Sequence, residues 1–122
     1  MLLKTGVDLV EIERLEQTIQ RYGERFLQRV FTEKELAEVG SNTASLAARF
    51  AAKEAVSKAL GTGLGTVSPL HIEVLRNEAN APVLFLQSEA QQRANLLDLQ
   101  TWSISLSHTN MHAIALVVAV GE

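Results

Sequence analysis

The sequence predicts an α+β fold in which a small, mainly antiparallel sheet packs against helices. Segments that alternate apolar and polar residues gather in the C-terminal half of the chain, and the longer helical patterns precede them. The chain has 122 residues, of which 47% are hydrophobic, so it suits one domain, residues 1–122, with a single core. An alanine-rich segment near the middle has high helix propensity, and we expect it to form the most buried helix.

The composition excludes several classes of protein. The absence of cysteine rules out a disulfide framework and thiolate metal sites, and it favours a cytoplasmic location. No charged N-terminal segment precedes an apolar run, and no apolar run approaches about 18 residues, so we expect neither a signal peptide nor a membrane partner. The net charge of −3 argues against a general nucleic-acid binder.

The first segment, Leu2 to Val10, is predicted to be a strand. Gly6 interrupts it, which indicates either a bulge or the close approach of another backbone. Asp8 lies on the face opposite to Val7, and an aspartate is unfavourable inside a strand. It is either an exposed residue near the strand end or a carboxylate that holds a metal ion. The face that contains Val7 carries Leu3, Thr5, Val7 and Leu9.

A helix is predicted from about Glu11 to Gln28, with Gly23 as a mild internal flaw. Its apolar stripe consists of Ile12, Leu15, Ile19, Tyr22 and Phe26. About a quarter-turn away lies a second stripe, which consists of Arg14, Arg21, Arg25 and Arg29. This arginine stripe is either a solvated face beside glutamates or a docking surface for an acidic partner. Thr32 to Glu35 then forms a capping box before a short helix that ends at Val39.

The central helix is predicted to follow a polar cluster in which Asn42 or Thr43 provides the cap. It ends at a glycine-rich segment, residues 61–65, where Gly61 occupies the position of a left-handed C-terminal cap. One side of the helix gathers Leu46, Phe50, Ser57 and Leu60, with Glu54 at its edge. We expect this side to face the core.

Charged residues of the central helix indicate an anion site. Arg49 and Lys53 repel each other across one turn, and an anion between them would reconcile the two charges. Glu54 and Lys58 form either an ordinary surface pair or part of the same site. The backbone amides of residues 61–65 offer a further anion nest, although glycine-rich turns are common.

The C-terminal half is predicted to contain four strands and one helix. The strands cover residues 70–76, 83–86, 102–107 and 113–120, with Ile72 and Val74 inward and the last two strands forming a hairpin. The helix is expected to start at Ser88, which caps it, and to end near Leu99. His108 ends the third strand, where it is either an exposed polar residue or a group that contacts a phosphate.

Four segments stand out in order along essentially the whole chain: Gly6–Ile12, Phe31–Leu36, Ala48–Gly63 and Ser105–Thr109. Together they resemble the holo-acyl-carrier-protein synthases, the small bacterial type of 4′-phosphopantetheinyl transferase. The block Arg-Phe-Ala-Ala-Lys-Glu-Ala, followed by Lys-Ala-Leu-Gly-Thr-Gly, is highly specific. The chain departs from common family residues at three places, which are Lys4 for a glycine, Ser41 for a basic residue, and Asn80-Ala81-Pro82 for Gly-Lys-Pro.

The resemblance implies a 4′-phosphopantetheinyl transferase fold and activity. Such an enzyme moves the phosphopantetheine arm of coenzyme A onto a serine of apo acyl carrier protein, and it releases adenosine 3′,5′-bisphosphate. It uses magnesium, takes an acidic carrier protein as its partner and supports fatty acid biosynthesis. The resemblance also implies a homotrimer with active sites between subunits. Asp8, Glu54 and Lys58 would then come from one protomer, and Arg49 and His108 from the next.

The resemblance assigns roles to individual residues. Asp8 and Glu54 match the pair that holds magnesium, which suits an ion that takes one or two carboxylates. Lys58 would neutralise the pyrophosphate, and the serine proton would pass to Glu54 or to water. The positions that match contacts to coenzyme A are Arg49, Lys53, Ser57, Gly61, Pro82, His108 and Thr109. The positions that match the carrier-protein surface are Arg14, Arg21 and Arg25.

Two other classes of function remain as alternatives. The first is a non-catalytic interaction domain that binds an acidic protein through the arginine stripe. The second is a module that binds a nucleotide or coenzyme A without transferring any group. The presence of both Asp8 and Glu54 favours the enzyme over these two alternatives.

Overall fold

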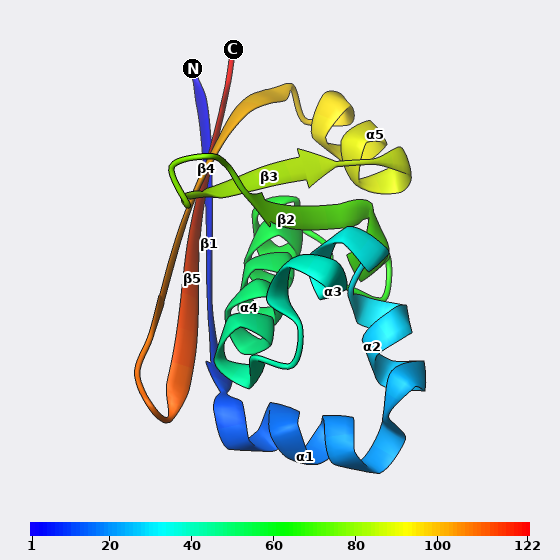
Figure 1. Ribbon diagram of the computed structural model, residues 1–122. Coiled ribbons are helices and arrows are strands. Elements are labelled where there is room, and N and C mark those ends of the chain that lie inside the picture. Colours follow the sequence, from blue (N-terminus) through cyan, green and yellow to red (C-terminus); the bar gives the residue numbers. More distant parts are fainter.

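A computed structural model describes residues 1–122 and shows a three-stranded sheet with helices packed on one of its faces (Figure 1). The α+β fold predicted from the sequence is confirmed. In chain order the elements are β1 (Leu2–Glu11), α1 (Ile12–Tyr22), α2 (Glu24–Val30), α3 (Glu33–Val39), α4 (Thr43–Ala59), the 3₁₀ helix η1 (Pro69–His71), β2 (Ile72–Arg76), β3 (Pro82–Leu86), α5 (Ser88–Leu96), β4 (Leu99–His108) and β5 (His112–Gly121).

Both sheets are antiparallel throughout. β5 is the middle strand of the larger sheet and pairs with β1 on one side and β4 on the other, whereas β2 and β3 form a separate two-stranded ribbon. The predicted hairpin between the last two strands is confirmed, and its ladder extends from the Leu99–Gly121 pair to the His108–Ala113 pair. Leu2 pairs with Gly121, so the two chain ends lie side by side at one end of the sheet (Figure 1).

The central helix α4 packs on the inner face of the larger sheet and is the most buried helix, as predicted. Its buried residues are Leu46, Ala47, Ala48, Arg49, Ala51, Ala52, Lys53, Ala55, Val56, Ser57 and Ala59. The many alanines allow the helix to lie close to β1. A methyl group added at Gly6 would lie 1.9 Å from the Ala55 carbonyl oxygen, so the predicted close backbone approach is confirmed.

The outer face of the larger sheet is apolar and exposed. The predicted alternation in β1 is confirmed, because Leu3, Val7 and Leu9 lie on this face with exposed fractions of 58%, 51% and 61%. On β5 the inner positions Ala113, Ala115, Val117 and Ala119 are buried, while the outer Ile114 and Leu116 are exposed. The sheet therefore covers α4 with one face and leaves a row of large apolar side chains uncovered on the other.

The single helix predicted from about Glu11 to Gln28 is wrong, because the structure divides it at Gly23. This glycine has a φ of 59°, and its N–H donates to the Ile19 carbonyl to close α1. Positive φ is accessible to glycine at little cost, so the chain turns here and α2 leaves in a new direction (Figure 1).

Local capping signals in the sequence are mostly confirmed. Thr32 and Glu35 form the predicted capping box, and the Asn42 side chain accepts from the Ser45 N–H to cap α4. Ser88 does not cap α5, since it has a φ of 47° and already belongs to the helix. α5 also ends earlier than predicted, and η1 replaces the first residues of the strand predicted at 70–76.

No helix has both the length and the apolar character that crossing a membrane requires.

Candidate active site

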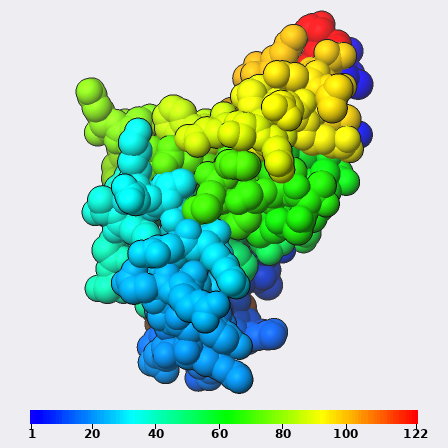
Figure 2. All heavy atoms as spheres, turned by 90° about the vertical axis from the view of Figure 1, so that its right-hand side faces the viewer, coloured from blue at the N-terminus to red at the C-terminus, as the bar shows by residue number.

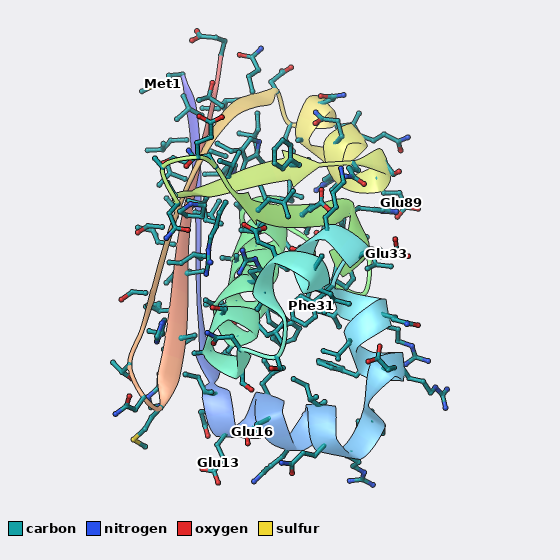
Figure 3. All side chains as sticks on the ribbon, viewed as in Figure 1. Met1, Glu13, Glu16, Phe31, Glu33 and Glu89 are labelled. Atoms are coloured by element: carbon teal, nitrogen blue, oxygen red, sulfur yellow. The ribbon has the colours of Figure 1, made fainter.

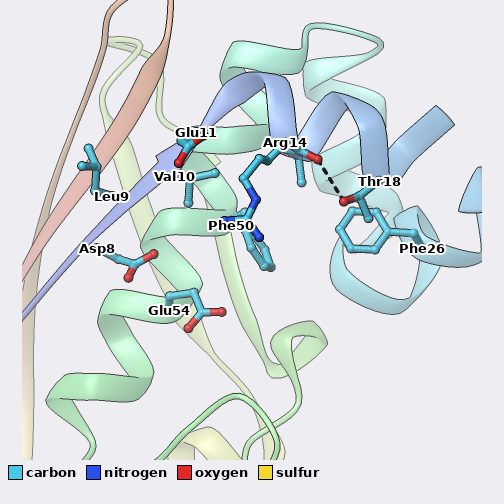
Figure 4. A pocket seen from close by; sticks show the side chains of 10 residues that line it. Asp8, Leu9, Val10, Glu11, Arg14, Thr18, Phe26, Phe50 and Glu54 are labelled. Atoms are coloured by element: carbon cyan, nitrogen blue, oxygen red, sulfur yellow. Dashed lines mark hydrogen bonds between the residues drawn. The ribbon is translucent and has the colours of Figure 1, made fainter. Parts of the chain in front are cut away.

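An acidic pair forms where β1 meets α4. Asp8 lies on β1, Glu54 lies on α4, and the close contact at Gly6 brings the two elements together. In Figure 4 both carboxylates lie at the same end of a cavity. The Lys58 ammonium, one turn after Glu54, donates to Asp8 Oδ1 and to the Val7 carbonyl, each at 2.9 Å. The structure thus brings together three residues that the sequence singles out.

The environment of Glu54 is suited to a cation. Burial raises the pKa of Glu54, the nearby Asp8 carboxylate raises it further, and the Lys58 ammonium opposes both effects. No cluster of three or more His, Cys, Asp or Glu side chains is arranged to hold a metal ion. Two carboxylates beside an open cavity fit magnesium, which takes one or two carboxylates and fills its other positions with water and phosphate oxygens.

The cavity beside the acidic pair has a volume of about 420 Å³. Phe26 and Phe50 contribute apolar wall, and their rings pack edge to face with centroids 6.3 Å apart. Arg14 also lines the cavity, and Thr18 donates its hydroxyl proton to the Arg14 carbonyl (Figure 4). The remaining lining residues are Leu9, Val10, Glu11 and Leu15. The acidic pair therefore opens onto a groove between β1, α1, α2 and α4 that combines an apolar wall with a cation.

A second cavity, of about 200 Å³, lies between α4, the β2–β3 turn and the end of β4. It brings together three residues predicted to contact coenzyme A, which are Arg49, Pro82 and His108. Arg76 contributes a second guanidinium group. Its other lining residues are Ser45, Ala48, Asn80, Leu106 and Ser107. We call this the cationic pocket.

The guanidinium of Arg49 is held in place by protein groups. Its Nε donates to the Val74 carbonyl at 2.9 Å, and its terminal nitrogen lies 3.5 Å from Glu38 Oε2. Burial lowers the pKa of Arg49 and Arg76 lowers it further, while Glu38 raises it. Two guanidinium groups and no carboxylate line the cationic pocket, so its lining carries positive charge, which favours the binding of an anion.

The two cavities face different sides of α4. Glu54 follows Arg49 by five residues, which places their side chains about 140° apart around a helix with about 100° per residue. The cavities share no lining residue. Residues assigned to one active site by the resemblance therefore fall into two groups within one copy of the chain.

The assignment of Lys53 to the nucleotide phosphates is wrong. Its side chain is fully buried, and its ammonium donates to Glu35 Oε1 at 2.8 Å, to the Pro69 carbonyl at 2.8 Å and to the Ile72 carbonyl. An ammonium has three N–H donors, and all three are used here. Lys53 has neither the exposure nor a free donor that contact with a phosphate requires.

Ser57 and Gly61 lie at the C-terminal end of α4. The Ser57 side chain is buried and donates to the Glu54 carbonyl at 2.7 Å. Gly61 has a φ of 74°, its N–H donates to the Lys58 carbonyl, and the Thr62 N–H donates to the Ser57 carbonyl. This pair of bonds closes the helix as a Schellman motif. The amides of Gly61 and Thr62 are therefore not available to the anion nest that the glycine-rich segment suggested.

Thr109 is used within the β4–β5 turn. Its hydroxyl oxygen accepts from the N–H groups of Met111 and His112, and it does not line the cationic pocket. Thr109 lines neither of the two cavities in a single copy of the chain, so its contact with coenzyme A stays a prediction.

The arginine stripe crosses the break between α1 and α2, and all its members are exposed. Arg14 lines the cavity beside the acidic pair, whereas Arg25 and Arg29 line a neighbouring depression of about 370 Å³ with Thr18, Tyr22 and Phe26. Arg21 lies over the ring of Tyr22, and the distance from its Cζ to the ring centroid is 5.4 Å.

Figure 2 shows α1 and α2, in blue, forming the lower part of this side of the molecule. Glu13 and Glu16 project from α1 into solvent (Figure 3).

Comparison with known proteins decides the family. Residues 4–117 match the family model of the 4′-phosphopantetheinyl transferase superfamily. The chain belongs to this superfamily. It is 48% identical over 127 residues to a holo-[acyl-carrier-protein] synthase of Herpetosiphon aurantiacus, which covers 98% of the chain and 100% of that protein. It is 47% identical over 133 residues to the protein of that name from Chloroflexus aggregans, with 97% and 95% covered.

Solved structures of the superfamily match the fold closely. Holo-[acyl-carrier-protein] synthase of Helicobacter pylori in complex with coenzyme A superposes with a TM-score of 0.86 at 35% identity, covering 95% of this chain and 99% of that one. The synthase from Bacillus anthracis in complex with CoA (3′,5′-ADP) gives a TM-score of 0.79 at 34% identity, with 98% and 96% covered. Relatives at about 35% identity thus have the same fold as this superfamily member.

The sequence did not predict that several residues of this superfamily member would line the two cavities. Arg76 and Asn80 enter the cationic pocket because the β2–β3 turn folds against α4. Phe26 and Phe50 are predicted as core residues, and the structure places them half-buried beside the acidic pair. Phe31, by contrast, lies inside, between α2, α3 and α4 (Figure 3). A helical period does not distinguish a cavity wall from a core position.

Proposed function

We propose that this chain is a holo-[acyl-carrier-protein] synthase, which transfers 4′-phosphopantetheine from coenzyme A to a serine of apo acyl carrier protein. The observation that carries the proposal is the acidic pair, Asp8 and Glu54, at the mouth of a cavity, with the Lys58 ammonium bonded to Asp8. The relatives' names and the coenzyme A complex of the Helicobacter pylori protein support the same reaction. Adenosine 3′,5′-bisphosphate is the second product.

The reaction is a displacement at phosphorus. The serine oxygen attacks the β-phosphorus of coenzyme A, the bond from that phosphorus to the bridging oxygen breaks, and the bisphosphate leaves with that oxygen. The serine proton goes to Glu54 or to a water molecule beside it. Lys58 uses two of its three N–H donors on Val7 and Asp8, which leaves one for a phosphate oxygen.

Asp8 and Glu54 would hold a magnesium ion. When bound, magnesium supplies positive charge that offsets the charge on the pyrophosphate oxygens. Glu54 suits this role because its pKa is raised by burial and by Asp8, so the carboxylate gains from a neighbouring cation. Removal of the metal with a chelator should abolish transfer, and added magnesium should restore it.

The active site is proposed to form between copies of the chain in a homotrimer. Coenzyme A carries a reacting pyrophosphate and a separate 3′-phosphate, and the acidic pair and the cationic pocket face different sides of α4. Arg49 and His108 of one copy would complete the site begun by Asp8, Glu54 and Lys58 of another. The exposed apolar face of the β1–β5–β4 sheet supplies a surface that a second copy can cover.

The arginine stripe is proposed to dock the acidic carrier protein. Arg14 lies in the cavity beside the acidic pair, so a carrier held there would bring its serine toward Asp8 and Glu54. Arg21 and Arg25 extend the same positive surface across the break at Gly23.

We also propose a role in fatty acid biosynthesis, since that process uses acyl carrier protein. A cytoplasmic location stays a prediction from the sequence.

Mass spectrometry tests the proposed reaction directly. The protein, coenzyme A and magnesium are incubated with apo acyl carrier protein, and the carrier should gain about 340 Da, the mass of the transferred group. Asp8→Asn and Glu54→Gln keep the size of each side chain, and each should lower turnover by about two orders of magnitude or more. A stable complex with the carrier but no mass gain would instead identify an interaction domain. Binding of coenzyme A alone would identify a nucleotide-binding module.

A further inference from the structure

The outer edge of β2 is paired with side chains instead of a strand. β2 pairs with β3 along one edge only, and a two-stranded ribbon has little stability by itself. Along the other edge, Glu35 Oε2 accepts from the Val74 N–H at 2.9 Å, and Arg49 Nε donates to the Val74 carbonyl at 2.9 Å. Glu38 Oε1 accepts from the Arg76 N–H at 2.8 Å.

Lys53 is the centre of this set of bonds. Its ammonium bonds to Glu35 from α3 and to the carbonyls of Pro69 and Ile72, so one group joins α3, α4 and the start of β2. Its side chain and that of Glu35 are both fully buried. Thr32 and Glu73 extend the network, because the Thr32 hydroxyl donates to Glu73 Oε2 at 2.6 Å.

The network holds the two walls of the cationic pocket. One wall is Arg49 on α4, and the opposite wall is Arg76 with the turn that carries Asn80 and Pro82. Lys53 attaches the start of β2 at Ile72, Glu35 attaches its middle at Val74, and Glu38 attaches Arg76 directly before the turn. A shift of β2 along or away from α4 would therefore change the distance between the two guanidinium groups.

We propose that Lys53 is a positioning residue for nucleotide binding, which fixes β2 against α3 and α4 and so sets the geometry of the cationic pocket without touching the ligand. The inference rests on the proposed function in that coenzyme A is the ligand. A buried ion pair contributes little to stability compared with apolar residues of the same volume, whereas it can specify one arrangement of the elements around it. Its three directed bonds to Glu35, Pro69 and Ile72 supply that specification here.

The test uses Lys53→Met, which keeps an unbranched side chain of nearly the same length and removes its donors. Binding of adenosine 3′,5′-bisphosphate is measured by isothermal titration calorimetry. It should weaken by about tenfold or more, because the distance between the Arg49 and Arg76 guanidinium groups changes. KM for coenzyme A should rise by a similar factor, whereas KM for apo acyl carrier protein should not change. Unchanged nucleotide affinity in Lys53→Met overturns the proposal.

Two controls separate positioning from loss of stability. Val117→Ala removes a buried side chain on β5 that makes none of these bonds, so it should lower Tm and leave nucleotide affinity unchanged. Lys53→Met combined with Glu35→Gln removes the unpaired carboxylate and should recover part of the lost Tm, while nucleotide affinity stays low. Recovery of affinity together with Tm overturns the positioning role. A wild type that does not bind the bisphosphate overturns the proposed function and this inference together.

Discussion

At the scale of single residues, identical functional groups behave differently because their surroundings differ. Glu35, Glu54 and Glu78 are all carboxylates in the sequence, yet Glu35 is buried in an ion pair, Glu54 is half-buried beside Asp8, and Glu78 is exposed in the β2–β3 turn. Burial and the neighbouring Asp8 carboxylate raise the pKa of Glu54. Its protonation therefore links the stability of the metal-free protein to pH.

We predict that Glu54→Gln stabilises the metal-free protein at neutral pH. Since the folded-state pKa of Glu54 is raised, its contribution to stability is present below the unfolded pKa and is lost as pH rises through the folded pKa. The difference in Tm between Glu54→Gln and wild type, measured with a chelator present, should therefore increase from about pH 4 to about pH 7. Glu78→Gln controls for the change in net charge, and a flat difference for Glu54→Gln contradicts the prediction.

A second residue-scale prediction concerns Gly6. An added methyl group would lie 1.9 Å from the Ala55 carbonyl oxygen, so Gly6→Ala must push β1 away from α4. Overpacking of this kind costs about 1–3 kcal/mol of stability, and separation of Asp8 from Glu54 should lower kcat by about tenfold or more. Gly63→Ala is the matched control, because its nearest neighbour would lie 4.0 Å away. If Gly6→Ala retains wild-type Tm and magnesium activation, β1 tolerates the displacement and Gly6 does not position Asp8.

At the scale of elements, the break at Gly23 decides the shape of the arginine stripe. A continuous helix would present Arg14, Arg21 and Arg25 along one straight line, whereas the turn at Gly23 places Arg14 and Arg21 on α1 and Arg25 on α2. Arg14 therefore lies beside the apolar wall of the cavity at the acidic pair, whereas Arg25 lies in the neighbouring depression with Phe26. This arrangement suits a partner that inserts apolar side chains while its acidic groups meet the arginines.

We predict that charge reversal on these helices weakens carrier binding selectively. Arg14→Glu, Arg21→Glu and Arg25→Glu should each raise KM for apo acyl carrier protein several-fold and leave KM for coenzyme A nearly unchanged. Raised salt should have a similar effect on the wild type, because exposed charges are screened over about 10 Å at 0.1 M. Lys34→Glu, an exposed reversal on α3, is the control. If KM for apo acyl carrier protein changes neither with salt nor with charge reversal, the arginine stripe is only a solvated face.

At the scale of the whole molecule, one copy of the chain has two separate cavities and an uncovered apolar sheet face. The acidic pair and the cationic pocket lie on different sides of α4 and share no lining residue. Leu3, Val7 and Leu9 are more than half exposed on the outer face of β1. Assembly into the proposed trimer would explain both features, since it would cover the apolar face and bring the acidic pair of one copy to the cationic pocket of another.

We predict that two inactive variants restore activity when their subunits are exchanged. Asp8→Ala damages the acidic half, and His108→Glu places a carboxylate in the cationic half at an exposed position. After dissociation, equal mixing and reassembly, about a quarter of the interfaces should contain two intact halves, so activity should approach a quarter of wild type. Asp8→Ala mixed with Glu54→Ala should not recover, because both residues belong to the same half. Demonstrated exchange without recovery for the first pair argues against a shared site.

The sequence by itself determined those features that depend on neighbours along the chain. The Thr32–Glu35 capping box, the Asn42 cap and the closure of α4 at Gly61 are made by groups within a few residues, so the pattern of residue types predicts them. Alternation in β1 likewise predicts which side chains share a face. The order of the four family segments was enough to assign the superfamily that the comparisons confirm.

Only the tertiary structure decided the location of the charged residues on α4. Lys53 and Lys58 are five residues apart in one helix, yet Lys53 is buried with Glu35 and two carbonyls, whereas Lys58 reaches Asp8 at a cavity mouth. A lysine is buried only where acceptors satisfy its ammonium, and here they come from α3, η1 and β2, which are distant in sequence. Helical spacing gives the angle of a side chain around its own axis, and the elements packed against that helix determine what the side chain contacts.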